Sequence, residues 1–184
     1  MRFSLLDRIT DLQRGSKITA VKLLRAEEDY LADHFPRFPV MPGVLMLECM
    51  YQAGAWLVRS SEDFKHAAVL LKEARNVKYS GFVTPGKELI VTAEITKEDE
   101  TTTTLKASGT VDGNVAVSAK LVLEKFNVGD RFPVRANCDP YIRNWMRGVF
   151  EGLMKPASET PPAAGATQNT PHFQVKSKLV SAQP

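Results

Sequence analysis

The residues best suited to chemistry in this sequence are a histidine and a glutamate, His34 and Glu48. His34 is followed by three prolines, Pro36, Pro39 and Pro42, which fix φ and predict a stiff loop. A neutral imidazole on such a loop is suited to act as a general base near pH 7. Glu48 is the only charged residue of the apolar run 44–58, and a carboxyl group buried among apolar side chains stays protonated and can act as an acid. The pair predicts acid–base catalysis, with a structural role for each side chain as the alternative.

The apolar run 44–58 is also the element that must position these two groups. Drawn as a helix it is apolar around its whole circumference, which predicts burial on every side. With about fifteen residues it is too short to span a bilayer. Gly43 stands at its start, where the first N–H groups of a helix have no partner inside the helix and lie at the positive end of its dipole. Gly43 is therefore a candidate site for binding an oxyanion.

Most of the remaining chain reads as β-strands. Alternating apolar and polar residues predict strands at 17–25, 67–77, 89–95, 101–111 and 115–123. Short turns join the later strands, among them the strong hairpin signal Asp112-Gly113, so the sheet is expected to be antiparallel. Only one long apolar helix is available to cover it. The sequence therefore predicts an α+β fold in which the sheet wraps around a central helix.

The chain beyond the last predicted strand divides into two parts. Residues 127–137 are expected to form an irregular basic connection, and Asp139 is expected to cap a following helix with Pro140 at its first position. This helix carries an apolar stripe for docking on the sheet or on another subunit: Ile142, Trp145, Met146, Val149, Phe150 and Leu153. A membrane-surface or partner-binding helix is the alternative. The predicted organisation is a domain at 1–126, an extension at 127–154 and a disordered tail at 155–184.

Composition excludes several classes of function. The 184 residues carry a formal net charge of +3, and the cations are scattered rather than gathered in a stripe, which argues against nucleic-acid binding. There is no spacing typical of metal ligands and no phosphate or nucleotide motif, so neither metal nor cofactor is expected. The N-terminal residues do not resemble a signal peptide. The two cysteines, Cys49 and Cys138, suggest reduced thiols and a cytoplasmic location.

The central stretch resembles a known family. Its motif is His34-Phe35-Pro36, then Pro39-Val40-Met41-Pro42-Gly43-Val44-Leu45, then Glu48 and Gln52. These residues are similar to those of the β-hydroxyacyl-acyl-carrier-protein dehydratases of the FabZ type, which have the hot-dog fold. Weaker matches occur at 5–8, 83–86 and 110–113, and the resemblance covers about residues 3–126.

The resemblance implies a role for each matching residue. His34 would remove the α-proton of a (3R)-hydroxyacyl thioester, and Glu48 would protonate the departing β-hydroxyl group. The helix starting at Gly43 and Val44 would polarise the thioester carbonyl, and Gln52 would orient Glu48. The remaining motif residues would support the site or contact the substrate: Val40 and Pro42 in support, and Phe35, Met41 and Tyr79 against the substrate.

The resemblance also implies partners. Its members act on an acidic acyl carrier protein and form homodimers in which histidine and glutamate come from different subunits, and such dimers commonly form trimers. Residues 78–82 replace the basic segment of the family, so Arg143 and Arg147 are a hypothetical substitute for carrier docking. Asp33 stands where the family has glycine. The alternatives are an enoyl-CoA hydratase or thioesterase on the same fold, and a non-catalytic acyl-binding protein.

Overall fold

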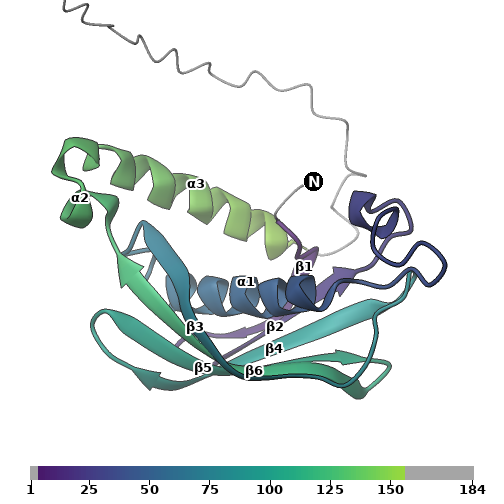
Figure 1. The fold of residues 1–184 in the computed structure, drawn as a ribbon. Coiled ribbons are helices and arrows are strands. Elements are labelled where there is room, and N and C mark those ends of the chain that lie inside the picture. Colours follow the sequence, from purple (N-terminus) through teal and green to yellow (C-terminus); the bar gives the residue numbers. More distant parts are fainter. Residues whose placement is uncertain (1–3, 156–184) are drawn as a thin grey trace, which may run out of the picture.

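A computed structural model describes residues 4–155 and has a six-stranded antiparallel sheet curved around one long helix (Figure 1). The order across the sheet is β1-β2-β4-β5-β6-β3, so the third strand in sequence lies at an edge. The strands are β1 (Arg8–Gln13), β2 (Lys17–Leu23), β3 (Ala68–Tyr79), β4 (Glu88–Glu98), β5 (Thr102–Val111) and β6 (Asn114–Phe126). The helices are η1 (Asp29–Leu31), α1 (Gly43–Ser61), α2 (Val128–Arg131), η2 (Pro133–Arg135) and α3 (Cys138–Leu153). This arrangement confirms the expected α+β architecture.

The strand pattern follows from alternation and turn chemistry. In β4, Leu89, Val91 and Ala93 are fully buried toward α1, while residues between them face outward. The hairpin between β5 and β6 turns at Asp112 and Gly113, whose φ values of 50° and 80° are those of the tight turn favoured by this dipeptide. Register and turn together place one apolar face of the sheet against the helix.

The central helix α1 is buried over its second half and uncovered along one side of its first half. Residues 53–60 are all buried, whereas Val44 is 68% exposed. The sheet covers one side of α1, and α3 lies on the side away from the sheet (Figure 1). The expectation that the helix is buried on every side is therefore wrong for the single chain, because no element of residues 4–155 covers the outer side of its first turns.

The helix α3 docks on the central helix through aromatic contacts. The Phe150 ring lies 6.1 Å from that of Trp56 and 5.6 Å from that of Phe64, and Leu153 is buried beside it. Trp145, expected in the docked stripe, is 57% exposed instead. The apolar stripe is wider than the surface available for docking, so its outer edge faces away from α1.

The connection between β6 and α3 is more regular than expected, because residues 127–137 contain α2 and η2. Asp139 is buried, and its carboxylate accepts the N–H groups of Val128 at 2.7 Å and Gly129 at 2.9 Å. It therefore caps α2 and not α3, which begins at Cys138. The prediction that Asp139 caps its own helix is wrong. The tail expected at 155–184 lies, beyond Lys155, outside the described residues.

His66 lies where the end of α1 approaches the extension, and it makes stability depend on pH. Neither ring nitrogen has a hydrogen bond within residues 4–155, and Nε2 lies 3.6 Å from the Glu62 carboxylate. Burial lowers the pKa of His66 from its usual 6.5, and the nearby Lys65 and Lys125 lower it further, which together outweigh the opposite effect of Glu62 and Asp130. The folded state therefore favours neutral His66.

A histidine with a lowered folded pKa contributes full stability above its unfolded pKa of about 6.5, and this stability is lost as the pH falls from there through the lower folded pKa. We expect the free energy of unfolding to drop between pH 7 and pH 5, and to drop less in a His66→Gln variant. Urea denaturation of both proteins at pH 5, 6 and 7 measures this difference. Equal losses in the two proteins would contradict it.

Candidate active site

The loop between η1 and α1 holds the His34 ring through two hydrogen bonds. The His34 backbone N–H donates to the carbonyl of Tyr30 at 2.9 Å, and ring Nδ1 lies 3.1 Å from the carbonyl oxygen of Val40. A carbonyl oxygen can only accept, so Nδ1 carries the proton of the neutral ring. The other nitrogen, Nε2, then has a free lone pair. This is the state that a general base requires.

The residue after the histidine, Phe35, has the one unusual backbone conformation of this loop. Its φ is 51°, in the left-handed region that costs a bulky residue about 1–3 kcal/mol. Asp33, where the family has glycine, does not have a positive φ, so the loop needs no glycine there. The Phe35 ring is 61% exposed and its centroid lies 4.4 Å from that of His34. It therefore lies beside the base, where the sequence predicts a substrate contact.

The start of α1 presents two free backbone donors. Pro42 is the N-cap and its carbonyl accepts the N–H groups of Leu45 and Met46. The N–H groups of Gly43 and Val44 donate to no acceptor in residues 4–155. The ring of Tyr79, from the edge strand β3, closes over this point: a β-carbon on Gly43 would lie only 3.0 Å from it. A side chain at position 43 would therefore disturb Tyr79.

Glu48 lies one turn further along α1 and is held by Gln52. The Gln52 side-chain amide donates to Glu48 Oε1 at 2.9 Å, and its oxygen accepts the backbone N–H of Leu5 at 3.0 Å. Because a backbone N–H can only donate, Leu5 fixes which end of the amide faces the carboxyl group. Glu48 is partly exposed in the single chain, so the complete burial expected from its apolar neighbours does not occur there.

Two other residues of the predicted site, Val40 and Met41, have side chains buried in the single chain. Met41 is 1% exposed and its N–H donates to Val83 O at 2.9 Å, so its side chain lies in the core of the single chain. Val40 is also buried and contributes through its carbonyl. Within residues 4–155, no hydrogen bond joins His34 to Glu48. Within one chain, His34 and Glu48 are therefore each held by their own contacts and are not bonded to each other.

Several exposed apolar side chains lie on the loops and elements that carry these groups, and the sequence analysis missed two of them. Phe38 and Phe82 contact each other edge to face at 5.6 Å, although they are 53% and 65% exposed. Phe35, Val44 and Tyr79 are exposed as well. We call these five residues the aromatic face. Phe38 and Phe82 stand in loops that contain proline or glycine, and a phenylalanine in such a loop could have indicated an exposed apolar surface. Their contact with each other cannot be inferred from the sequence, because it forms only in the folded chain.

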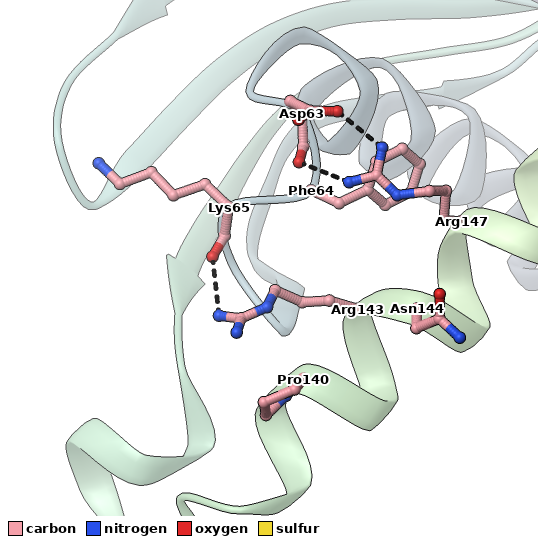
Figure 2. Close-up of a pocket in the computed structure, with 7 residues that line it drawn as sticks. All are labelled: Asp63, Phe64, Lys65, Pro140, Arg143, Asn144 and Arg147. Atoms are coloured by element: carbon pink, nitrogen blue, oxygen red, sulfur yellow. Dashed lines mark hydrogen bonds and ion pairs between the residues drawn. The ribbon is translucent and has the colours of Figure 1, made fainter.

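The two arginines of α3 bind the segment that follows the C-terminal end of α1, whereas His34 precedes its N-terminal end. Arg147 binds the Asp63 carboxylate at 2.7 Å and its carbonyl at 3.1 Å, and it covers the Phe64 ring at 4.7 Å. Arg143 donates to Lys65 O at 3.4 Å and to the Asn127 side chain. Figure 2 shows both side chains reaching from α3 across a shallow pocket toward the 63–65 segment. Carrier docking by these arginines stays a hypothesis.

Residues 4–155 give no support for a metal site, a membrane-spanning helix or a cysteine nucleophile. No group of three His, Cys, Asp or Glu side chains there could hold a metal ion, and no helix there is long and apolar enough to cross a membrane. Both cysteines are free. Cys49, beside Glu48, is buried, and burial raises the pKa of its thiol to about 12, which is unsuitable for a nucleophile at neutral pH.

Comparison with known proteins agrees with the geometry. A FabA-like domain matches residues 1–120. The 3-hydroxyacyl-[acyl-carrier-protein] dehydratase FabZ of Clostridium botulinum is 38% identical over 120 residues, which cover 65% of this chain and 83% of that protein. The FabZ protein of Lactococcus lactis is 38% identical over 119 residues, covering 65% and 82%.

A solved structure supports the fold. The dehydratase heterocomplex ApeI:P from Xenorhabdus doucetiae superposes with a TM-score of 0.58 at 18% identity, over 72% of this chain and 89% of that chain. The expected hot-dog fold is confirmed. With a domain match over most of the chain and relatives of this identity, the chain belongs to the FabA-like family and is related within it to the FabZ 3-hydroxyacyl-[acyl-carrier-protein] dehydratases.

Proposed function

We propose that this protein removes water from a (3R)-hydroxyacyl chain carried as a thioester on acyl carrier protein, giving the trans-2-enoyl thioester in fatty-acid synthesis. Its family membership supports the reaction. The observation that carries the assignment of residues is the contact between His34 Nδ1 and Val40 O. It leaves Nε2 unprotonated, as a base beside a thioester must be.

The proposed reaction uses one base and one acid. His34 Nε2 takes the proton from the α-carbon, and the electron pair of that C–H bond is delocalised onto the thioester carbonyl before it forms the Cα–Cβ double bond. The Cβ–O bond breaks as protonated Glu48 gives its proton to the hydroxyl group, which leaves as water. The cycle closes when His34 releases its proton and Glu48 takes one up. Gln52 donates to Glu48 Oε1, so the transferable proton belongs on Oε2.

The start of α1 is suited to the charge that develops on the thioester oxygen. Removing the α-proton moves negative charge onto the carbonyl, and the free N–H groups of Gly43 and Val44 are donors for it. The helix dipole adds to this effect at the same end. Tyr79, packed against Gly43, and Phe35, beside His34, are proposed to contact the acyl chain near its reacting carbons.

The proposed active unit is a homodimer in which His34 of one chain works with Glu48 of the other. The aromatic face and the unpaired edge of β3 are both exposed in the single chain, and exposed apolar surface next to an open strand edge is typical of an interface. Covering this face would bury Glu48 further and exclude water from the site. The trimer of dimers found in the family is carried over as part of this proposal, and light scattering tests it.

The carrier protein and a cytoplasmic location belong to the same proposal. The relatives are dehydratases of acyl-carrier-protein substrates by name. Exposed Cys138 is a free thiol, which suits a reducing compartment.

The test is reversible hydration of a crotonyl thioester, offered on carrier protein and on CoA. We expect turnover on the carrier protein. Turnover on CoA alone would favour an enoyl-CoA hydratase, and release of the free acid would indicate a thioesterase. Acyl binding by a folded protein without any turnover would contradict the enzyme and favour a non-catalytic acyl-binding role.

A further inference from the structure

A buried lysine of β2 binds the residue that precedes η1, the turn before His34, and has no part in the reaction described above. Lys22 is on β2, and its side chain is only 5% exposed, although lysine is rarely buried without a partner. Its ammonium group binds the carboxylate of Glu28, which is 21% exposed. Removing two charges from water costs free energy that their attraction only partly offsets, so stability alone is a weak explanation for such a pair.

Glu28 connects this pair to the histidine through one turn of backbone. It immediately precedes η1, and its carbonyl accepts the N–H of Leu31 at 3.0 Å. Leu31 is buried, and the carbonyl of its neighbour Tyr30 accepts the N–H of His34 at 2.9 Å. A sheet strand is thus linked to the base by an ion pair and a hydrogen-bonded turn.

The central helix meets the same cluster. Helix α1 packs against β2, and Cys49, the residue next to Glu48, is buried in the core against which Tyr30 packs. The Tyr30 hydroxyl is also buried there, with no hydrogen bond in residues 4–155. Strand β2, turn η1 and helix α1 therefore meet in one buried core, with the Lys22–Glu28 pair joining the first two.

We propose that Lys22 and Glu28 are a positioning pair that fixes η1 to β2 and so holds the His34 ring with Nδ1 on Val40 and Nε2 toward the substrate. The inference rests on the proposed role of His34 as the base. Without the pair, η1 keeps the backbone hydrogen bond from Glu28 N–H to Arg25 O, 3.3 Å, but loses its ion pair to β2, and we expect the ring to leave the Val40 carbonyl more often. Misplacing a catalytic group by about 1 Å can cost about 100-fold in rate.

The first test removes both charges together, in a Lys22→Met/Glu28→Gln double variant, so that neither is left buried alone. We expect kcat to fall about 10-fold or more, with KM changed less than about twofold, because the pair acts on the base and not on substrate binding. The matched control is Lys17→Met/Glu94→Gln, which removes an exposed pair, 3.1 Å apart, between β2, the strand that carries Lys22, and its neighbour β4. Its kcat should equal that of wild type.

The second test needs no substrate. The chain has three histidines, and nitrogen-15 NMR with a His34→Gln reference assigns the His34 ring. Wild type should show the Nδ1–H tautomer, and the double variant a mixture of tautomers. A folded double variant with wild-type kcat and an unchanged tautomer would overturn the proposal.

The NMR result also separates this proposal from the proposed function. A changed tautomer in a protein that turns over no thioester would refute the dehydratase and still support the positioning pair. If the double variant does not fold, a Lys22→Met/Glu28→Met variant carries both measurements, because it also leaves neither charge buried alone and replaces the pair by apolar side chains of similar volume.

Discussion

Replacing Glu48 by glutamine is expected to lower the rate of dehydration by about 1,000-fold, because a general acid typically contributes about 100- to 10,000-fold. The amide has nearly the shape of the carboxyl group and has no proton to give to the leaving hydroxyl. Its oxygen can still accept from Gln52, which now donates to Glu48 Oε1 at 2.9 Å. KM should therefore change little, and the loss should appear in kcat. Steady-state kinetics on a 3-hydroxyacyl carrier-protein thioester measures this.

The control for this substitution is Glu94→Gln, the same chemical change at an exposed carboxylate of β4. We expect wild-type kinetics there. The free energy of unfolding of the Glu48→Gln variant should lie within about 0.5 kcal/mol of wild type, since the side chain is only partly buried in the single chain. A Glu48→Gln enzyme that retains more than a tenth of wild-type kcat would exclude Glu48 as the acid.

Replacing Val44 by glutamate is expected to give a folded monomer with almost no activity. Val44 is 68% exposed on the uncovered side of α1, and an acidic residue in the first turn of a helix favours the helix, so the single chain should fold. In a symmetric dimer the two new charges would face each other or the apolar partner surface, which costs several kcal/mol. At 1.4 kcal/mol per factor of ten, we expect dimer affinity to fall by about 100-fold or more.

Light scattering and activity measured on the same samples test this expectation. The matched control is Val134→Glu, because Val134 in η2 is 95% exposed and lies outside the aromatic face. It should keep the mass and activity of wild type. A dimeric, fully active Val44→Glu protein would show that this side of α1 is not the interface and would remove the basis for a site shared between chains.

Patterns that depend on neighbours in the sequence predicted most of the fold. The alternation in β4 and the Asp112-Gly113 turn act over a few residues, and both appear as expected. The proline loop and the start of α1 at Gly43 likewise follow from local backbone chemistry. The residues of the motif could be named for the same reason, since they lie within one short stretch.

Features that depend on distant contacts could not be predicted in this way. Asp139 has the composition of a helix cap, but the fold brings another helix end closer to its carboxylate. The sequence around Lys22 is typical of a strand residue that faces solvent. In the structure its side chain is buried on β2 and binds Glu28. The exposure of Val44 could not be predicted either, because an apolar helix face can be covered by the same chain or by a second chain, and the sequence does not distinguish the two. In each case the outcome depends on how separate elements pack against one another, even where the partner is only six residues away, as Glu28 is from Lys22.

The central claim is that His34 of one chain and Glu48 of its partner form one site, and mixing two inactive variants tests it most directly. His34→Ala and Glu48→Gln homodimers each lack one group in every site. A mixed dimer has one site with both defects and one intact site, so after subunit exchange of equal amounts about one quarter of wild-type activity should return. Two different affinity tags confirm that mixed dimers have formed. Mixed dimers without activity would contradict a site built from two chains.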